Sequence, residues 1–351
     1  MRKTIIKRVT ILGALVILVI SCSKSFLETK PFGSVNEEIL STSEKGADAL
    51  LIAAYSGLDG FTGWDNSTPW GGASSNWTFG SIAGGDAYKG SEAGDQPDIT
   101  PIERHSVDAN NPYLEGKWRN YYDGISRVNQ AIKAFKKLET ITAEKKVLRI
   151  AEARFLRAYF HYDLWKIFRN VPYIDETLED VRIGNDANIL PKIQADLEAA
   201  KTGLPVSQPE IGRATKGAAQ SLLGLTYMWT KEYGKAKSEF DAVIASGKYK
   251  LNANFHDNFD AATRNSQEGI LEVQQSVNDG TTDNGNNGDI LNFPYNGGPA
   301  GCCGFHQPSQ DLVNAFQTTA GGYESVGNLA GGREVSNFGG NVRFRPGRLA
   351  V

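Results

Sequence analysis

Helical periodicity dominates residues 113–246 and leaves few alternatives to a mainly α fold. The clearest segment spans 143–168, where apolar residues recur at steps of three and four and therefore share one helix face. That face consists of Val147, Ala151, Phe155, Ala158, Tyr162 and Trp165. Pro172, shortly after this segment, cannot continue a helix. Further helices are predicted over 44–58 with Ser43 as N-cap, 113–138, 188–204, 213–230 and 233–246.

Two of these helices carry a spacing typical of tetratricopeptide repeats. Leu223-Gly224-x-x-Tyr227 is followed by Ala236-x-x-x-Phe240 in the next helix. Small Gly and Ala residues let two antiparallel helices approach closely, while aromatic residues fill the space between neighbouring pairs. The segments 113–138 and 143–168 resemble a second, degenerate pair. We therefore expect a mainly α fold: a tetratricopeptide-like stack of helical hairpins with long loop-rich insertions and little β structure.

The first 22 residues have the organisation of an export signal that ends in a lipid-modified cysteine. A basic start precedes residues 9–20, an uncharged and mostly apolar run of twelve residues. This run is shorter than the about 20 residues that span a bilayer. It ends in Ser21-Cys22, which resembles the bacterial lipobox. We expect a signal peptide over 1–21, lipid attachment at Cys22, and an anchor and tether over 22–43; an ordinary secretory signal is the alternative.

Two regions outside the helical stretch differ in composition. Residues 60–112 are rich in Gly, Ser, Asn and Asp, and loops of this length in compact domains are usually functional or disordered. After residue 250 the pattern predicts a strand over 268–274, a Gly- and Asn-rich stretch over 278–304, and the beginning of a helix over 308–317.

Composition and motif searches exclude several classes of function. The chain has 37 basic and 40 acidic residues, so it lacks the basic surface that nucleic acid binding needs. The sequence contains no P-loop, no Gly-x-Ser-x-Gly elbow and no dinucleotide-binding fingerprint. Its four His residues lack metal-ligand spacing, and the Asp-rich stretch 279–289 misses the calcium-loop register. We expect no cofactor and no metal, with His161 packed in the core.

The aromatic residues of the 60–112 loop suggest how the protein could bind a ligand. Sugar rings present patches of C–H bonds that lie well on flat aromatic faces. The candidate ligand-binding residues are Trp64, Trp70, Trp77, Tyr88 and, further along the chain, Tyr295. The alternative for each is a buried plug that fills space in the loop. Trp118, Trp165 and Trp229 lie on helical stripes and are expected in the core.

Several motifs along the chain match one family. They comprise Cys22-Ser23 followed by Phe26-Leu27-Glu28-x-x-Pro31, the loop Gly85-Asp86-Ala87-Tyr88-Lys89-Gly90, the helix pattern Trp118-x-x-x-Tyr122, the run Ala151-Glu152-Ala153-Arg154-Phe155-Leu156-Arg157-Ala158-Tyr159 with Val171-Pro172, the run Gly212-Arg213-Ala214-Thr215-Lys216-Gly217, and Gly304-Phe305-x-Gln307-Pro308. With these motifs the chain resembles the SusD/RagB family of Bacteroidetes outer-membrane nutrient-binding lipoproteins.

The resemblance implies a location, a partner and a division of the chain. Such proteins are lipid-anchored at the outer membrane, exposed on the cell surface, and cap a TonB-dependent, SusC-like transporter. They capture oligosaccharides or other nutrients for import and do not catalyse. The resemblance assigns 44–250 to the helical-repeat region and 251–351 to the start of the family's C-terminal region. We expect that region to be truncated, because the family continues through an Asp-Pro-Arg segment that is not found here.

Two other functions remain open from the sequence. A lipid-anchored helical-repeat adaptor would bind another protein and no sugar, and helices without aromatic loops would favour it. A lipoprotein glycosidase would need a deep cleft with two carboxylates about 5–10 Å apart. The Trp-bearing loop favours the binding protein.

Overall fold

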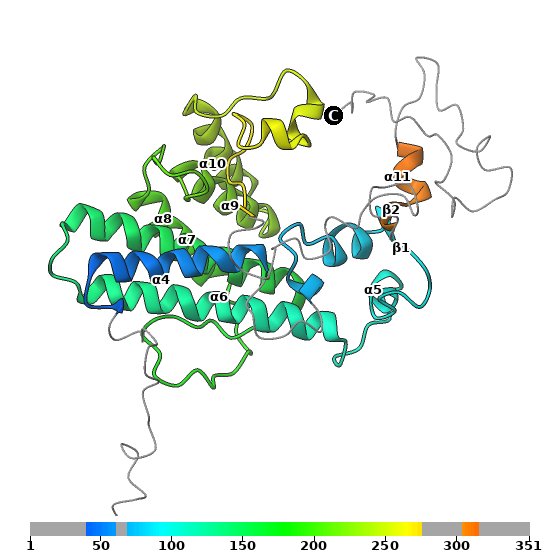
Figure 1. Ribbon diagram of the computed structural model, residues 1–351, viewed down its shortest axis with the longest axis horizontal. Helices are drawn as coiled ribbons and strands as arrows, with labels where there is room; N and C mark the ends of the chain where they lie inside the picture. Colours follow the sequence, from blue (N-terminus) through cyan, green and yellow to red (C-terminus); the bar gives the residue numbers. More distant parts are fainter. Residues whose placement is uncertain (1–39, 61–68, 276–303, 316–351) are drawn as a thin grey trace, which may run out of the picture.

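A computed structural model describes residues 40–60, 69–275 and 304–315 (Figure 1). The predicted lipid attachment at Cys22 and the candidates Trp64 and Tyr295 lie outside these ranges. The α-helices are α4 (Glu44–Ser56), α5 (Ile99–Glu103), α6 (Pro112–Lys137), α7 (Ala143–Phe168), α8 (Leu190–Gly203), α9 (Lys216–Trp229), α10 (Tyr233–Ala245) and α11 (Gln310–Ala315). The strands are β1 (Ala87–Gly90) and β2 (Phe305–Pro308), and short helical turns span Gly57–Asp59, Pro69–Gly72, Thr78–Ile82, Phe255–Asn258 and Ala261–Thr263.

The long helices α6 and α7 form the centre of the fold. Asn111 caps α6 by accepting the amide of Tyr113, and Thr142 caps α7 by accepting the amide of Lys145. The helices lie close together at Gly124, where an added Cβ would lie 2.7 Å from the ring of Phe160. The predicted boundaries of the 143–168 helix are confirmed.

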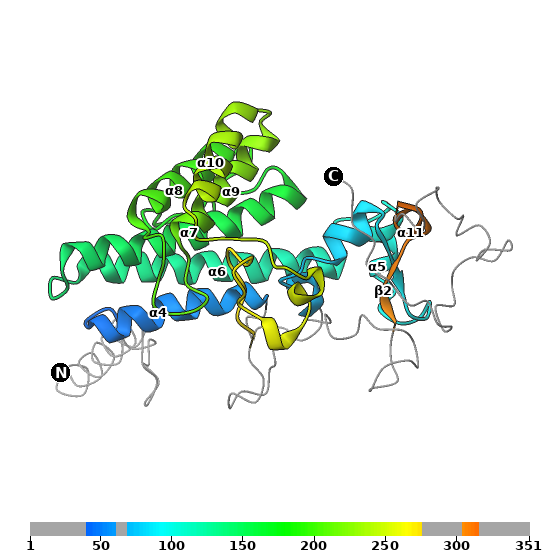
Figure 2. The same ribbon diagram turned by 90° about the horizontal axis from the view of Figure 1, so that it is seen from above.

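The other long helices pack in chain order around this centre (Figures 1 and 2). α4 packs on α6, α7 packs on α8, α8 on α9, and α9 on α10. The last contact is the predicted tetratricopeptide-like pair, since a Cβ at Gly224 would lie 2.6 Å from Cε1 of Phe240. One continuous apolar core joins α4, α6, α7, α8 and α9. The expected mainly α, tetratricopeptide-like stack is therefore confirmed.

Several local predictions are wrong. The segment 268–274 is not a strand: it consists of a turn, bends and irregular backbone, and the carboxylates of Glu268 and Glu272 accept the backbone amides of Asn252 and Asn265. Val147 is 56% exposed and Trp229 is 47% exposed, so neither belongs to the core. None of the helices in the described ranges is long and apolar enough to cross a membrane.

A small second core lies beyond the N-terminal end of α6 (Figure 2). It contains the helix α5 and the antiparallel ribbon β1–β2, in which Tyr88 faces Gln307 and Gly90 faces Phe305. The predicted helix over 308–317 begins later than expected, at Gln310, since residues up to Pro308 belong to β2. The ribbon therefore joins two segments more than 200 residues apart in the chain.

Candidate functional site

The aromatic residues of the loop region gather around the β1–β2 ribbon. The centroid of the Trp70 ring lies 5.1 Å from that of Phe305 and 6.1 Å from that of Trp77, and Trp77 and Phe305 are also 6.1 Å apart. Tilted and edge-on contacts at these distances are the arrangements that aromatic rings prefer. The three rings and their apolar neighbours form a compact core that supports the ribbon from behind.

This arrangement separates the predicted ligand-binding residues into two kinds. Trp77 is only 2% exposed, so it is the buried plug rather than a ligand platform, and its expected ligand contact has to be withdrawn. Trp70 is partly buried against the same core. Tyr88 is 44% exposed, because the alternation along β1 points Ala87 and Lys89 inward and Tyr88 outward. Of the predicted aromatics within the described ranges, Tyr88 is therefore the one most accessible to a ligand.

A buried lysine holds the turn that follows Tyr88. The ammonium of Lys89 donates to the carbonyls of Gly90, Glu92 and Asp95 at 2.8–2.9 Å. Its pKa is lowered mainly by burial, which the nearby Asp95 carboxylate partly opposes. Gly90 adopts a φ of +72°, and a Cβ there would meet the carbonyl oxygen of Gly304 at 2.2 Å. The Lys89 ammonium and the left-handed backbone of Gly90, a conformation that glycine adopts without strain, together fix the shape of this turn.

A second buried lysine connects this region to the helical stack. Lys117 of α6 is fully buried and pairs with Asp163 of α7, while its ammonium donates to Oδ1 of Asn76 at 3.1 Å. Burial lowers the pKa of Lys117 to about 8, and the Asp163 carboxylate opposes that shift. Burial would raise the pKa of Asp163, but Lys117 and Lys166 lower it to about 2. Asn76 immediately precedes Trp77, so the ion pair fixes the aromatic core on the stack.

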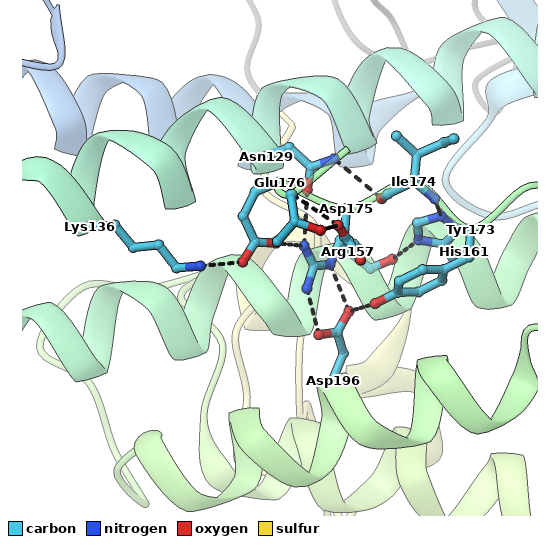
Figure 3. A network of polar contacts seen from close by, with 10 residues as sticks. Asn129, Lys136, Arg157, His161, Tyr173, Ile174, Asp175, Glu176 and Asp196 are labelled. Carbon is cyan, nitrogen blue, oxygen red and sulfur yellow. Dashed lines mark hydrogen bonds and ion pairs between the residues drawn. The ribbon is translucent and has the colours of Figure 1, made fainter. Parts of the chain in front are cut away.

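A buried polar network of the stack surrounds Arg157 (Figure 3). Its guanidinium makes two hydrogen bonds of 2.7 Å to Asp196 of α8 and one of 3.0 Å to Asn129 of α6. It also pairs with Glu176, which Lys136 contacts at 2.6 Å. The network therefore joins three helices to the segment that follows α7.

His161 contributes to this segment as a neutral side chain. Its Nδ1 lies 3.0 Å from the carbonyl oxygen of Arg157, which can only accept, so Nδ1 carries the proton. Nε2 then accepts the amide of Ile174 at 3.2 Å. Burial lowers the pKa of His161 to about 3. The prediction that His161 is a packed core residue is confirmed.

No group of three His, Cys, Asp or Glu side chains is placed to hold a metal ion within the described ranges. The sequence did not reveal Lys89, Lys117 or Asp163 as organising residues, because lysine and aspartate are ordinarily surface residues. The motif around Lys89 was the only signal that could have pointed to one of them.

Comparison with known proteins finds similarity to SusD-like proteins. Residues 77–228 match the model of a SusD-like family described as starch-binding and associating with the outer membrane. The SusD-like protein P2 of Formosa agariphila is 25% identical over 257 residues, which cover 70% of this chain and 48% of that protein. The chain thus spans about half the length of this relative.

Solved structures agree with this match. A surface glycan-binding protein A from Bacteroides fluxus is similar with a TM-score of 0.67 and 28% identity, over 79% of this chain and 62% of that one. A surface glycan-binding protein A from Bacteroides thetaiotaomicron, solved in complex with laminarihexaose, has the same fold with a TM-score of 0.67 and 20% identity over the same shares. The chain is accordingly similar in sequence and in fold to SusD-like proteins, the relationship that its motifs suggest.

Proposed function

We propose that this protein is a cell-surface lipoprotein that captures glycans and passes them to a TonB-dependent outer-membrane transporter. The observation that carries the proposal is the match of residues 77–228 to a starch-binding family, within which the exposed Tyr88 lies. The 28% identity to a surface glycan-binding protein extends over most of the chain and supports the same function.

The glycan site would lie on the outer face of the β1–β2 ribbon. Tyr88 would stack on a sugar ring, and Gln307 lies directly opposite it in the ribbon and would bind hydroxyl groups. Trp70 would line the edge, supported by Trp77 and Phe305 from behind. Trp64 and Tyr295 remain candidates for the same site.

The remaining parts of the proposal concern the anchor and the partner. Residues 1–21 would be removed as a signal peptide, Cys22 would carry the lipid, and residues 22–43 would tether the helical-repeat region 44–250 to the outer membrane. Residues 251–351 would begin the family's C-terminal region. A Cys22→Ser variant should leave the membrane fraction of its native host, and co-purification of a transporter with the parent chain tests the partner.

Glycan binding is tested with one aromatic and its matched control. We expect Tyr88→Ala to weaken binding about three- to tenfold, the range of one lost aromatic contact. Tyr233→Ala is the control, because Tyr233 is an exposed tyrosine on α10, away from the ribbon. A glycan array selects the ligand, with laminarihexaose and maltohexaose as first probes, and calorimetry measures affinity. Equal affinities for the two variants would refute the ribbon site.

A protein-binding adaptor is the second candidate. Leu225, Met228, Trp229 and Tyr233 are all exposed at the end of the α9–α10 pair, and exposed apolar side chains of this kind often mark protein contacts. A parent chain that binds no glycan on the array but retains a protein from its host envelope would favour this function.

A further inference from the structure

A groove runs along α6 on a face that the β1–β2 ribbon does not reach. Its volume is about 460 Å³, within the range of ligand sites in proteins. One wall is α6 from Trp118 to Lys133, and the other is the segment 172–181 that follows α7. This segment runs as a loop beside α6, whereas β1 and β2 lie beyond the helix's N-terminal end (Figure 1). The sixteen residues of helix from Trp118 to Lys133 make the groove about 22 Å long.

Two aromatic side chains form the apolar part of the groove. Trp118 and Tyr122 are one helical turn apart, with ring centroids 4.8 Å apart and planes inclined by 44°. The Trp118 ring packs edge-on against Phe168 at 5.2 Å, and the Tyr122 hydroxyl donates to the carbonyl of Pro172 at 2.7 Å. Both rings are only partly buried, so they are held in place with surface left for a ligand.

Polar groups continue the same face of the helix. Ser126, Gln130 and Lys133 follow Tyr122 at steps of four and three, and all three line the groove. None of these three side chains has a hydrogen bond or ion pair to another residue of the described ranges. Opposite them lies Asp175, whose Oδ1 accepts the amide and hydroxyl of Thr177 at 2.9 and 2.6 Å. The groove therefore offers free donors and acceptors beside its aromatic rings.

The floor of the groove belongs to the buried Arg157 network (Figure 3). The Asn129 side chain donates to the carbonyl of Ile174 at 3.2 Å and accepts from Arg157. His161 binds the amide of the same Ile174. Both walls are thus fixed to each other before any ligand arrives, which reduces the ordering cost of binding.

From this geometry we infer that the α6 groove is a second binding site, for a neutral oligosaccharide. The aromatic rings suit the C–H faces of sugars, and the amide, hydroxyl, ammonium and carboxylate groups suit their hydroxyls. The charges of Lys133 and Asp175 balance, so the groove does not favour a strongly anionic glycan. This inference rests on the proposed glycan-binding function and adds a site independent of Tyr88.

The test uses the full chain in calorimetric titrations with laminarihexaose and maltohexaose. The parent is expected to bind at two sites. The double variant Gln130→Ala/Lys133→Ala should weaken one site about tenfold through lost hydrogen bonds, and Ser126→Arg should block it. Lys137→Ala is the matched control, because it removes an exposed lysine one turn along α6 that does not line the groove. Tyr88→Ala should weaken only the other site.

The possible outcomes separate the inference from the proposed function. Binding at a single site that Tyr88→Ala weakens and the groove variants leave unchanged would overturn the second site alone. If the groove of the parent chain binds an anionic oligosaccharide and no neutral one, and the groove variants lose that binding, the proposed ligand class is wrong. A parent chain that binds no glycan of any kind on an array would overturn the proposed function itself.

Discussion

Arg157 allows a sharp test of how the helical stack is held together. Arg157→Met removes a buried guanidinium whose partners Asp196 and Glu176 are themselves buried. Removing one partner of a buried ion pair costs about 3–5 kcal/mol, because the other charge stays unpaired. Each carboxylate keeps one further donor, Lys136 or the Tyr173 hydroxyl. We therefore expect a loss in the lower half of that range, about 3–4 kcal/mol.

The loss is measured by urea unfolding followed by circular dichroism. A domain is stable by about 5–15 kcal/mol, so the midpoint should fall clearly. Lys136→Ala is the control on the same carboxylate: Lys136 is 48% exposed, and its loss should cost less than about 1 kcal/mol. The double variant Arg157→Met/Asp196→Leu should regain much of the stability, because both charges of that pair are removed and Glu176 keeps Lys136 as its partner. A cost of Arg157→Met no larger than that of the control, or additive effects in the double variant, would refute the reasoning.

Two further predictions concern the packing of α9 on α10 and the response to pH. Gly224→Ala should destabilise the chain by about 1–3 kcal/mol in urea unfolding, since its Cβ would overlap the Phe240 ring. Gly234→Ala, a helical glycine with open space around its Cβ, should be neutral or stabilising by up to about 1 kcal/mol, and equal costs at both glycines would contradict the close approach. The pKa of His161 is about 3 in the folded protein and about 6.5 in the unfolded chain. The unfolded chain therefore binds more protons between these values, and stability should fall as the pH drops from 6.5 towards 3, by up to about 1.4 kcal/mol per pH unit from this group. His161→Gln, which keeps a donor and an acceptor, should flatten this slope in urea midpoints measured from pH 7 to 4; an unchanged slope would show that the imidazole is not held neutral.

The helices could be predicted from the sequence because their signals are local. The boundaries of α7 follow from the apolar face of 143–168 and from Pro172 beyond its end. The pairing of Gly224 with Phe240 also follows from a fixed spacing. The β1–β2 ribbon could not be predicted, since no pattern within 87–90 indicates that its partner lies at 305–308. The strand predicted at 268–274 is wrong for the same reason: a local residue pattern does not show whether a partner strand lies beside it.

The candidate site could be predicted only in part. The sequence placed Trp77 and Tyr88 in one loop, but strand pairing and packing decide that Tyr88 faces outward and Trp77 inward. Burial of Lys117 and Asp163 depends on two helices meeting side by side, and nothing in either helix alone indicates it. The sequence placed Trp118 in the core, whereas the structure leaves part of its ring open to the α6 groove.

The Lys117–Asp163 pair and the Arg157 network fix the positions of neighbouring segments more than they add to stability. Apolar side chains of similar size often stabilise a core at least as well as a buried ion pair. A charged pair, however, accepts few arrangements of its partners. Asp163 and Arg157 lie six residues apart on α7, about 9 Å along the helix. The Lys117–Asp163 pair fixes Asn76, which precedes Trp77 of the ribbon's core. The Arg157 network fixes Asn129 and the segment beside the groove. Both candidate binding surfaces are thus positioned from one helix, which gives a reason for Arg157 and Asp163 to occupy the interior of α7.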